Sequence, residues 1–250
     1  MTPGKDLVEA RTTFDLAARA TDADLPAGAE KTALVRTMFD TIAPRYDLVN
    51  RLMTFGLDIG WRKQSVRALG LPAGSKVLDL ACGTGDFLRI LAQAGLRPFG
   101  LDLSWGMLSA NRTGAPLAQA NAASLPVATG AVDGITCGYA LRNFTDLVPA
   151  FEEFGRVVRP GGRLSILEVA EPEHGLLRVG DRIWFRRVVP VIGGILSDRA
   201  AYSYLPRSTA YLPPTGELRA LLNDAGFSSV NRRALSGGLS QLLTATRRGR

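Results

Sequence analysis

Two glycines separated by one residue, Gly83 and Gly85, lie between an apolar stretch and a segment with helical spacing. Residues 77–81 have the apolar, β-branched character of a buried strand, and a helical pattern begins at Phe87. Glycine in such a turn lets the backbone adopt angles that side chains forbid, so backbone N–H groups can approach a ligand closely. A strand, a tight turn and a helix N-terminus in this order predict a nucleotide-binding site.

The residues around the turn restrict the kind of nucleotide. Position 88 is Leu where a dinucleotide fingerprint has its third glycine, so capture of a pyrophosphate is not favoured. Asp79 and Asp86 flank the turn and suit a cationic ligand better than a polyanion. These features favour an adenosine without phosphates, and S-adenosylmethionine is such a ligand.

The next apolar stretch supports this interpretation. Residues 98–103 read as a short strand that carries Asp102, 19 residues after Gly83. An acid at this place in a βαβ unit accepts hydrogen bonds from ribose hydroxyls. A third short strand, residues 117–122, would place the amide of Asn121 at the adenine edge. The alternative is an ordinary βαβ unit whose loop ends happen to be acidic.

Composition limits the classes of protein to which the chain can belong. At 250 residues and 46% hydrophobic content it is long enough for one domain with a full core, with or without a small appendage. No apolar run approaches about 18 residues, so no membrane span is predicted, and Asp6 and Glu9 interrupt any signal sequence. Cys82 and Cys137 lie in strand-like stretches, which indicates a reducing, cytoplasmic location. The sequence contains a single histidine, His174, so a histidine metal site or a Ser-His-Asp triad is not expected.

The net charge of +7 has two explanations, which both stay open. Only four of the 30 basic residues are lysines, which fits a compositional bias of the genome. Attraction to an anionic surface, such as the inner face of the cell membrane, would also favour this charge. No basic run is interleaved with aromatic residues, so no nucleic-acid partner is expected.

The chain divides into three parts around the predicted site. Residues 1–30 read as a flexible N-terminal arm, and residues 31–74 as a helical cap. Within the cap, helical spacing is broken at Pro44, and Tyr46 follows the break together with Asp47 and Asn50. Polar groups at such a break usually face a cleft, although packing alone would also account for them. Residues 75–250 then form the main domain.

Further elements deliver polar groups to the same edge of the sheet. Residues 135–139 read as the fourth strand, and Arg142 and Asn143 follow it directly. In open α/β sheets the ligand crevice lies at the carboxyl ends of the strands. A turn at Pro160-Gly161-Gly162 precedes a fifth strand at 163–169, and residues 227–234 and 239–246 read as closing strands.

Several of these segments together resemble one family. FDTIAPRYDLVNRLMTFGLDIGWR, VLDLACGTGD, QANAASLP, ALRNFTD, RVVRPGGRLSILE and LRALLNDAGF are similar to the ubiquinone/menaquinone biosynthesis C-methyltransferases, from about residue 35 to 245. The resemblance implies an α/β, Rossmann-like class I methyltransferase fold: a mostly parallel seven-stranded sheet with helices on both faces and a reversed final hairpin. It implies S-adenosylmethionine as donor and a prenylated benzoquinol or naphthoquinol as acceptor. The donor-binding positions it implies are Thr84, Asp102, Asn121 with Ala122, and Gly138, where relatives often have a serine.

Carbon methylation sets requirements that the acceptor site must meet. A quinol ring carbon must lie in line with the methyl–sulfur bond, and the quinol must lose a proton. Arg142 would stabilise the quinolate oxygen, with Asn143 and Tyr46 orienting the ring, and a carboxylate or an ordered water would serve as base. The alternative is that Arg142 only forms a structural salt bridge, for instance with Asp146.

Residues 171–216 read as a helical lid inserted in the main domain. Apolar and basic residues alternate there, as in Trp184, Phe185, Arg186 and Arg187. The apolar side would pack on the core, meet a second copy of the chain in a homodimer, or admit a polyprenyl tail at the membrane surface. These alternatives stay open.

The sequence favours a demethylmenaquinol methyltransferase, because the arginine-rich composition and the short connection at 95–99 resemble actinobacterial members of the family. A class I methyltransferase for a ubiquinone precursor or another aromatic or lipid acceptor is one alternative. A non-catalytic scaffold that binds S-adenosylmethionine is another, since fold alone does not give function.

Overall fold

The computed structural model describes residues 27–170, 172, 175–189, 191, 204 and 207–249. Most of the predicted arm, His174 and residues 192–203 of the predicted lid lie outside these ranges, as do the side chains of Leu176, Leu177 and Phe185.

A seven-stranded sheet forms the centre of the protein, in the order β3-β2-β1-β4-β5-β7-β6. The first five strands run parallel, whereas β7 is antiparallel to both β5 and β6. The predicted seven-stranded, Rossmann-like α/β fold with a reversed final hairpin is therefore confirmed. The strands are β1 (Lys76–Leu80), β2 (Arg97–Asp102), β3 (Leu117–Gln119), β4 (Val132–Gly138), β5 (Val158–Val169), β6 (Phe227–Leu235) and β7 (Ser240–Arg247).

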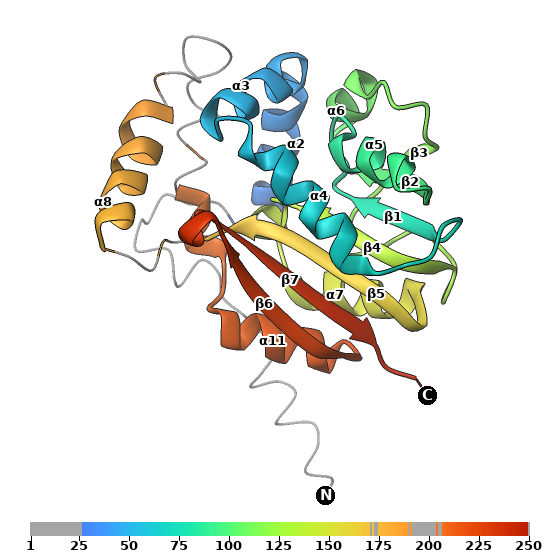
Figure 1. The fold of residues 1–250 in the computed structure, drawn as a ribbon. Helices are drawn as coiled ribbons and strands as arrows, with labels where there is room; N and C mark the ends of the chain where they lie inside the picture. The colour runs from blue at the N-terminus through green and yellow to red at the C-terminus, as the bar shows by residue number, and fades with distance from the viewer. Residues whose placement is uncertain are drawn as a thin grey trace, which may run out of the picture.

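Helices cover both faces of this sheet. Figure 1 shows α4 in front of the sheet, with α7 and α11 behind it. In the described part of the main domain the helical segments are α5 (Asp86–Gln93), α6 (Trp105–Ala110), η2 (Leu141–Asn143), α7 (Leu147–Val157), α8 (Gly175–Ile183), η3 (Trp184–Val188), η4 (Thr209–Tyr211) and α11 (Thr215–Asp224). No helix within the described ranges is both long and apolar enough to cross a membrane.

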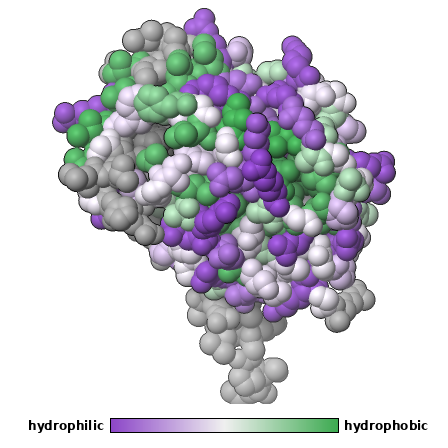
Figure 2. Space-filling view, viewed as in Figure 1, coloured by the Kyte–Doolittle hydropathy of each residue, from purple (hydrophilic) through white to green (hydrophobic). Residues whose placement is uncertain are grey.

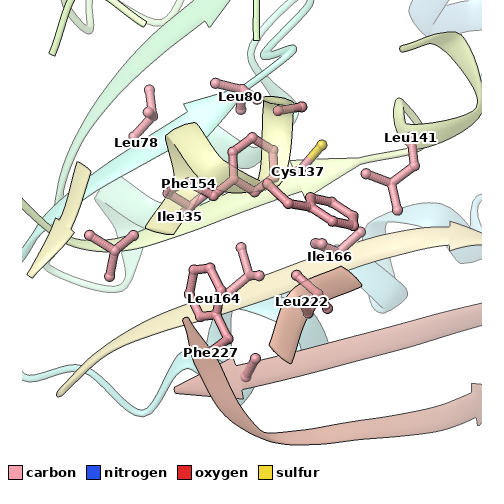
Figure 3. Packing of buried hydrophobic residues seen from close by; sticks show 14 of the residues in the cluster. Leu78, Leu80, Ile135, Cys137, Leu141, Phe154, Leu164, Ile166, Leu222 and Phe227 are labelled. Carbon is pink, nitrogen blue, oxygen red and sulfur yellow. The ribbon is translucent and has the colours of Figure 1, made fainter. Parts of the chain in front are cut away.

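The main core lies between the sheet and the helices α7 and α11 (Figure 3). Ile135 and Ile166 from adjacent central strands face Phe151 and Phe154 of α7, and all four side chains are fully buried. Burying one such side chain contributes about 1.5–3 kcal/mol, so this layer fixes the strands whose ends carry the polar groups.

The N-terminal cap consists of α2 (Gly28–Ile42), η1 (Ala43–Arg45), α3 (Tyr46–Met53) and α4 (Leu57–Leu69). Pro44 lies in η1, where its ring ends the α2 hydrogen-bond pattern, as the sequence predicts. Helix α2 begins at Gly28, inside the range predicted as a flexible arm. Lys31, Val35, Met38 and Ile42 form its buried face.

Two strand boundaries also differ from the sequence-based expectation. Strand β5 begins at Val158 rather than at 163, because Val158 pairs with Val132 and the Pro-Gly-Gly segment forms an irregularity before Arg163 pairs with Gly134. Strand β3 ends at Gln119, and Asn121 makes only an isolated bridge to Ser124.

Candidate functional site

A cavity of about 370 Å³ opens between the carboxyl ends of the strands and the cap. That volume lies within the range of small-molecule sites, which is about 300–1,000 Å³. Strands β1, β2 and β4 and the loops after them supply one wall, and helix α2 supplies the other. The predicted site residues that line the cavity are Tyr46, Gly83, Asp102, Asn121, Ala122, Gly138 and Asn143.

The backbone is unusual where β1 and β4 end at the cavity. Gly83 and Gly85 have φ of 51° and 95°, and Ala81 and Tyr139, which carry side chains, have φ of 53° and 59°. Side chains disfavour this left-handed region, and residues held there concentrate at ligand sites. A Cβ added at Gly85 would lie 2.4 Å from Thr113 Cγ2, so glycine is required at this position. The turn predicted from Gly-x-Gly is therefore present.

Asp102 is placed to accept hydrogen bonds from hydroxyl groups. Its Oδ2 accepts a hydrogen bond from Gly83 N at 2.8 Å, and its Oδ1 accepts one from Ser104 N at 2.8 Å. Each oxygen keeps a further lone pair, so the carboxylate can accept from two neighbouring hydroxyls. Burial raises the pKa of Asp102 to about 6, although hydrogen bonds from the backbone N–H groups of Ser104, Gly83 and Leu103 lower it.

The end of the cavity next to β3 presents amide and backbone groups. Asn121 Oδ1 accepts from Ala123 N at 3.0 Å, which orients the side-chain amide.

Gly138, at the end of β4, lies against the ring of Phe87. A Cβ at Gly138 would be 2.6 Å from Phe87 Cε2. A serine at this position would therefore meet the Phe87 ring, which occupies the space that its Cβ needs.

Three predicted donor-binding residues lie outside the cavity lining. Asp79 is buried and accepts from Thr136 Oγ1 at 2.8 Å, and burial raises its pKa to about 8. Thr84 Oγ1 donates to Asp47 Oδ1 at 2.5 Å, which joins the glycine turn to α3 of the cap. Gly85 shapes the turn through its backbone angles. Roles for these residues in donor binding stay predictions.

Asp86 likewise faces arginines of the protein. Arg51 donates to both of its carboxylate oxygens at 2.7 Å, and Arg62 and Arg89 also pair with it. These arginines hold the pKa of Asp86 below its usual value, although burial opposes them. Arg51 and Arg62 also pair with Asp58, so the cluster ties the cap helices α3 and α4 to the start of α5.

Arg142 forms a salt bridge, but its partner is Glu168 rather than Asp146. The partner suggested in the sequence analysis is wrong, because Asp146 is the N-cap residue of α7 and accepts from Val148 N at 2.9 Å. Glu168 ends the apolar run of β5, which directs its carboxylate to the same edge of the sheet as η2. The pair is buried from solvent.

Several buried polar atoms beside the cavity have no hydrogen-bond partner in the described structure. They are Arg142 Nε, Asn143 Oδ1, Glu168 Oε2 and Tyr204 Oη. Buried polar atoms are nearly always paired, so such a group indicates a partner that the protein alone does not supply. Tyr46 lies near Arg142, because the charge of Arg142, like that of Arg62, lowers the pKa of Tyr46 while burial raises it. The structure thus brings the three predicted catalytic residues together.

Two charged residues of this region escaped the sequence analysis. Glu168 lies inside the predicted fifth strand, and a charge in an otherwise apolar strand is a signal that could have identified it. Lys31 is buried in the face of α2 formed by Val35 and Met38. It is four residues before Val35, so the helical period of the apolar face could have revealed it.

An apolar surface lies outside the cavity, over α3 and α8. Figure 2 shows hydrophobic residues at the upper left of the molecule, around these helices. Phe55, which is 72% exposed, lies with its ring centroid 4.8 Å from that of Trp184. Trp184 Nε1 donates to Met53 O at 3.1 Å, which joins the predicted lid to the cap. Leu48, Leu52, Val179 and Ile183 are the other exposed members of this surface.

Known proteins share both the sequence and the fold. Residues 27–247 match the model of the ubiE/COQ5 methyltransferase family. The ubiquinone/menaquinone biosynthesis C-methyltransferase UbiE of Syntrophotalea carbinolica is 42% identical, over 85% of this chain and 93% of its own. The demethylmenaquinone methyltransferase of Roseiflexus castenholzii is 40% identical, over 90% of this chain and 98% of its own.

A solved structure supports the fold alone. A phosphoethanolamine N-methyltransferase of Haemonchus contortus, in complex with S-adenosyl-L-methionine, has a TM-score of 0.57 at 13% identity. The similarity covers 76% of this chain and 53% of that one.

Proposed function

This chain belongs to the ubiE/COQ5 methyltransferase family and is an S-adenosylmethionine-dependent methyltransferase of quinone biosynthesis, and we propose that its acceptor is demethylmenaquinol. The reaction moves the donor's methyl group to a ring carbon ortho to a quinol oxygen. Relatives named demethylmenaquinone methyltransferase support this choice of acceptor over a ubiquinone precursor. In this proposal residues 31–74 act as a cap and residues 171–216 as a lid on the methyltransferase domain.

The donor would occupy the cavity beneath α2. The Asp102 carboxylate has lone pairs left for both ribose hydroxyls, and Asn121 with the backbone at Ala122 would contact the adenine edge. The backbone at Gly83 and Gly138 lines the cavity without a side chain in the way. S-adenosylmethionine supplies an electrophilic methyl group on a sulfonium ion.

The acceptor would lie where Arg142, Asn143 and Tyr46 meet. A cationic guanidinium next to the quinol oxygen favours its deprotonated form and stabilises the charge that drives attack by the ring carbon. Asn143 Oδ1 can accept a hydrogen bond from a quinol hydroxyl, and Tyr46 would orient the ring. The observation that carries this assignment is the set of buried polar atoms of Arg142 and Asn143 that have no partner.

The apolar surface over α3 and α8 would receive the prenyl tail. It is continuous with the buried cluster that contains Tyr46, Met53 and Trp184, so a tail leaving the acceptor site would reach it. Exposed Arg178 and Arg187 lie on the segment that carries Val179 and Ile183, and would favour an anionic membrane surface. Contact with the membrane follows from this proposal, whereas a homodimer formed through the same surface would block it.

Quinone analysis of cells that lack the protein tests the proposal. A demethylated menaquinone should accumulate, and expression of the parent chain should restore menaquinone. An unchanged menaquinone pool, or accumulation of a different precursor, would reject demethylmenaquinol as the acceptor.

A further inference from the structure

A buried ammonium group that the proposed reaction does not use lies in the cap. Lys31 of α2 is 1% exposed, and its Nζ donates to Phe144 O at 2.7 Å. The same Nζ lies 3.6 Å from the centroid of the Tyr211 ring. No carboxylate in the described part of the chain pairs with Lys31, and burial lowers its pKa to about 7. A buried amine with only these partners costs folding free energy, so stability alone does not explain it.

The carbonyl that Lys31 binds belongs to the residue that follows Asn143. The turn of Leu141–Asn143 is therefore held on both sides. Arg142 ties it to Glu168 of β5, and Lys31 ties its end to the cap. A hydrogen bond of 2.6 Å between Thr32 Oγ1 and Thr145 Oγ1 lies next to the Lys31 contact.

The ring that Lys31 faces brings in a third element. Tyr211 belongs to η4, at the end of the predicted lid, and η4 packs against η2. Nζ of Lys31 thus lies where the cap, the turn with Arg142 and the end of the lid meet. A protonated amine over an aromatic face adds attraction that an apolar side chain of the same length lacks.

We propose that Lys31 is a positioning residue for the acceptor site, which fixes the turn with Arg142 and Asn143 against the cap. This inference rests on the proposed function, because it assigns the turn a role in aligning the quinol. Displacement of a catalytic turn by about 1 Å can slow a reaction by roughly 100-fold. Loss of the Lys31 contact should therefore slow methyl transfer although Lys31 does not line the cavity.

The test compares Lys31→Met with Lys63→Met, which alters an exposed lysine of α4. Single-turnover transfer from saturating S-adenosylmethionine to demethylmenaquinol is measured for the parent and both variants. Lys31→Met should be slower by roughly 10- to 100-fold. Its melting temperature near neutral pH should be equal to or above that of the parent, because a desolvated charge has been removed. The Lys63→Met protein should behave as the parent does.

The outcomes separate this inference from the proposed function. An inactive parent would refute the proposed function, whereas an active parent with an equally fast Lys31→Met variant would overturn the role of Lys31. If Lys31→Met is also less stable, sites are counted by titration with S-adenosylhomocysteine and the rate per site decides. A parental rate per site means a structural role and overturns the inference.

A second variant covers the case in which Lys31→Met does not fold. Lys31→Arg keeps the cation but moves its donors away from Phe144 O. It should bind S-adenosylhomocysteine and still transfer methyl groups more slowly than the parent. Full activity of Lys31→Arg would contradict the need for this geometry.

Discussion

Arg142 and Glu168 form an ion pair buried from solvent, in which Arg142 Nη1 donates to Glu168 Oε1. Glu168 Oε1 also accepts from Val169 N at 2.9 Å, so the carboxylate is itself fixed to the backbone. The guanidinium is therefore oriented before any substrate arrives. A preorganised charge stabilises a developing anion without reorganising during the reaction.

Because of this pair, Arg142→Ala should have two separate effects, one on catalysis and one on stability. We expect kcat to fall by about 10²–10³, the size seen when one electrostatic donor is removed. Affinity for S-adenosylmethionine should change little, because Arg142 does not line the donor cavity. Arg142→Lys should restore activity only in part, because it lacks the planar fork.

The same substitution leaves Glu168 buried without its partner. Breaking a buried pair in this way costs about 3–5 kcal/mol of folding free energy. Denaturant unfolding should show that loss for Arg142→Ala and a partial recovery for Arg142→Ala with Glu168→Gln, while kcat of the double variant stays low. Recovery of kcat together with stability would mean that Arg142 acts only through the fold.

Binding of the donor should depend on the charge of Asp102. Its pKa is raised to about 6, so below this pH the folded protein holds the proton and the side chain loses acceptor capacity. Affinity measured by calorimetry should therefore fall as the pH drops through about 6, because the bound state needs the carboxylate. At neutral pH, Asp102→Ala should weaken binding by roughly 10- to 100-fold, since a hydrogen bond to a charged group contributes about 1.5–3 kcal/mol.

Asp102→Asn is the matched control for the pH dependence. It keeps the shape of the side chain but does not titrate, so its weaker affinity should be flat across the same pH range. A profile for Asp102→Asn that parallels the parent would assign the pH dependence to another group, such as Asp79.

Most of the fold could be predicted from the sequence, because buried strands and glycine turns are local signals. The apolar stretch at 77–81 correctly predicts β1, and the predicted closing strands agree with β6 and β7 to within one residue at each end. The start of β5 could not be predicted, because its pairing of Val158 with Val132 depends on a neighbouring strand.

The site was predictable in its types of residue but not in its pairings. Asp102 and Asn121 follow strands whose ends meet at one edge, so their position at the cavity follows from the order of elements. The partner of Arg142 was not predictable, because Glu168 is 26 residues away and comes near only when β4 pairs with β5. The contact of Lys31 with Phe144 spans 113 residues and depends on the cap docking.

The effects of substitutions at Gly138 and Phe87 on stability should depend on each other. A Cβ at Gly138 would lie 2.6 Å from Phe87 Cε2, so Gly138→Ser should destabilise the protein by about 1–3 kcal/mol through overpacking. Adding Phe87→Leu makes room for the new side chain, so the double variant should be more stable than the sum of the two single effects. Strict additivity in a denaturant double-mutant cycle would show that the two positions do not interact.

Exposed apolar residues over α3 and α8 should matter for long-tailed quinols. Phe55→Ser with Ile183→Ser removes two exposed side chains of this surface, which lie outside the cavity. The double variant should raise KM for demethylmenaquinol in vesicles and leave turnover of a tail-less analogue unchanged. Trp105→Ser is the control, because Trp105 is 64% exposed but lies on α6. Equal losses on both substrates would mean that the surface is only structural.

Transfer of a labelled methyl group in vitro is the direct test of carbon methylation by this protein. The purified protein is given S-adenosylmethionine with an isotopically labelled methyl group and demethylmenaquinol under reducing conditions, and the quinol is analysed by mass spectrometry and NMR. We expect one labelled methyl group on the ring carbon ortho to a quinol oxygen, with one S-adenosylhomocysteine formed per product. Donor binding without transfer, or a label found on oxygen, would contradict it.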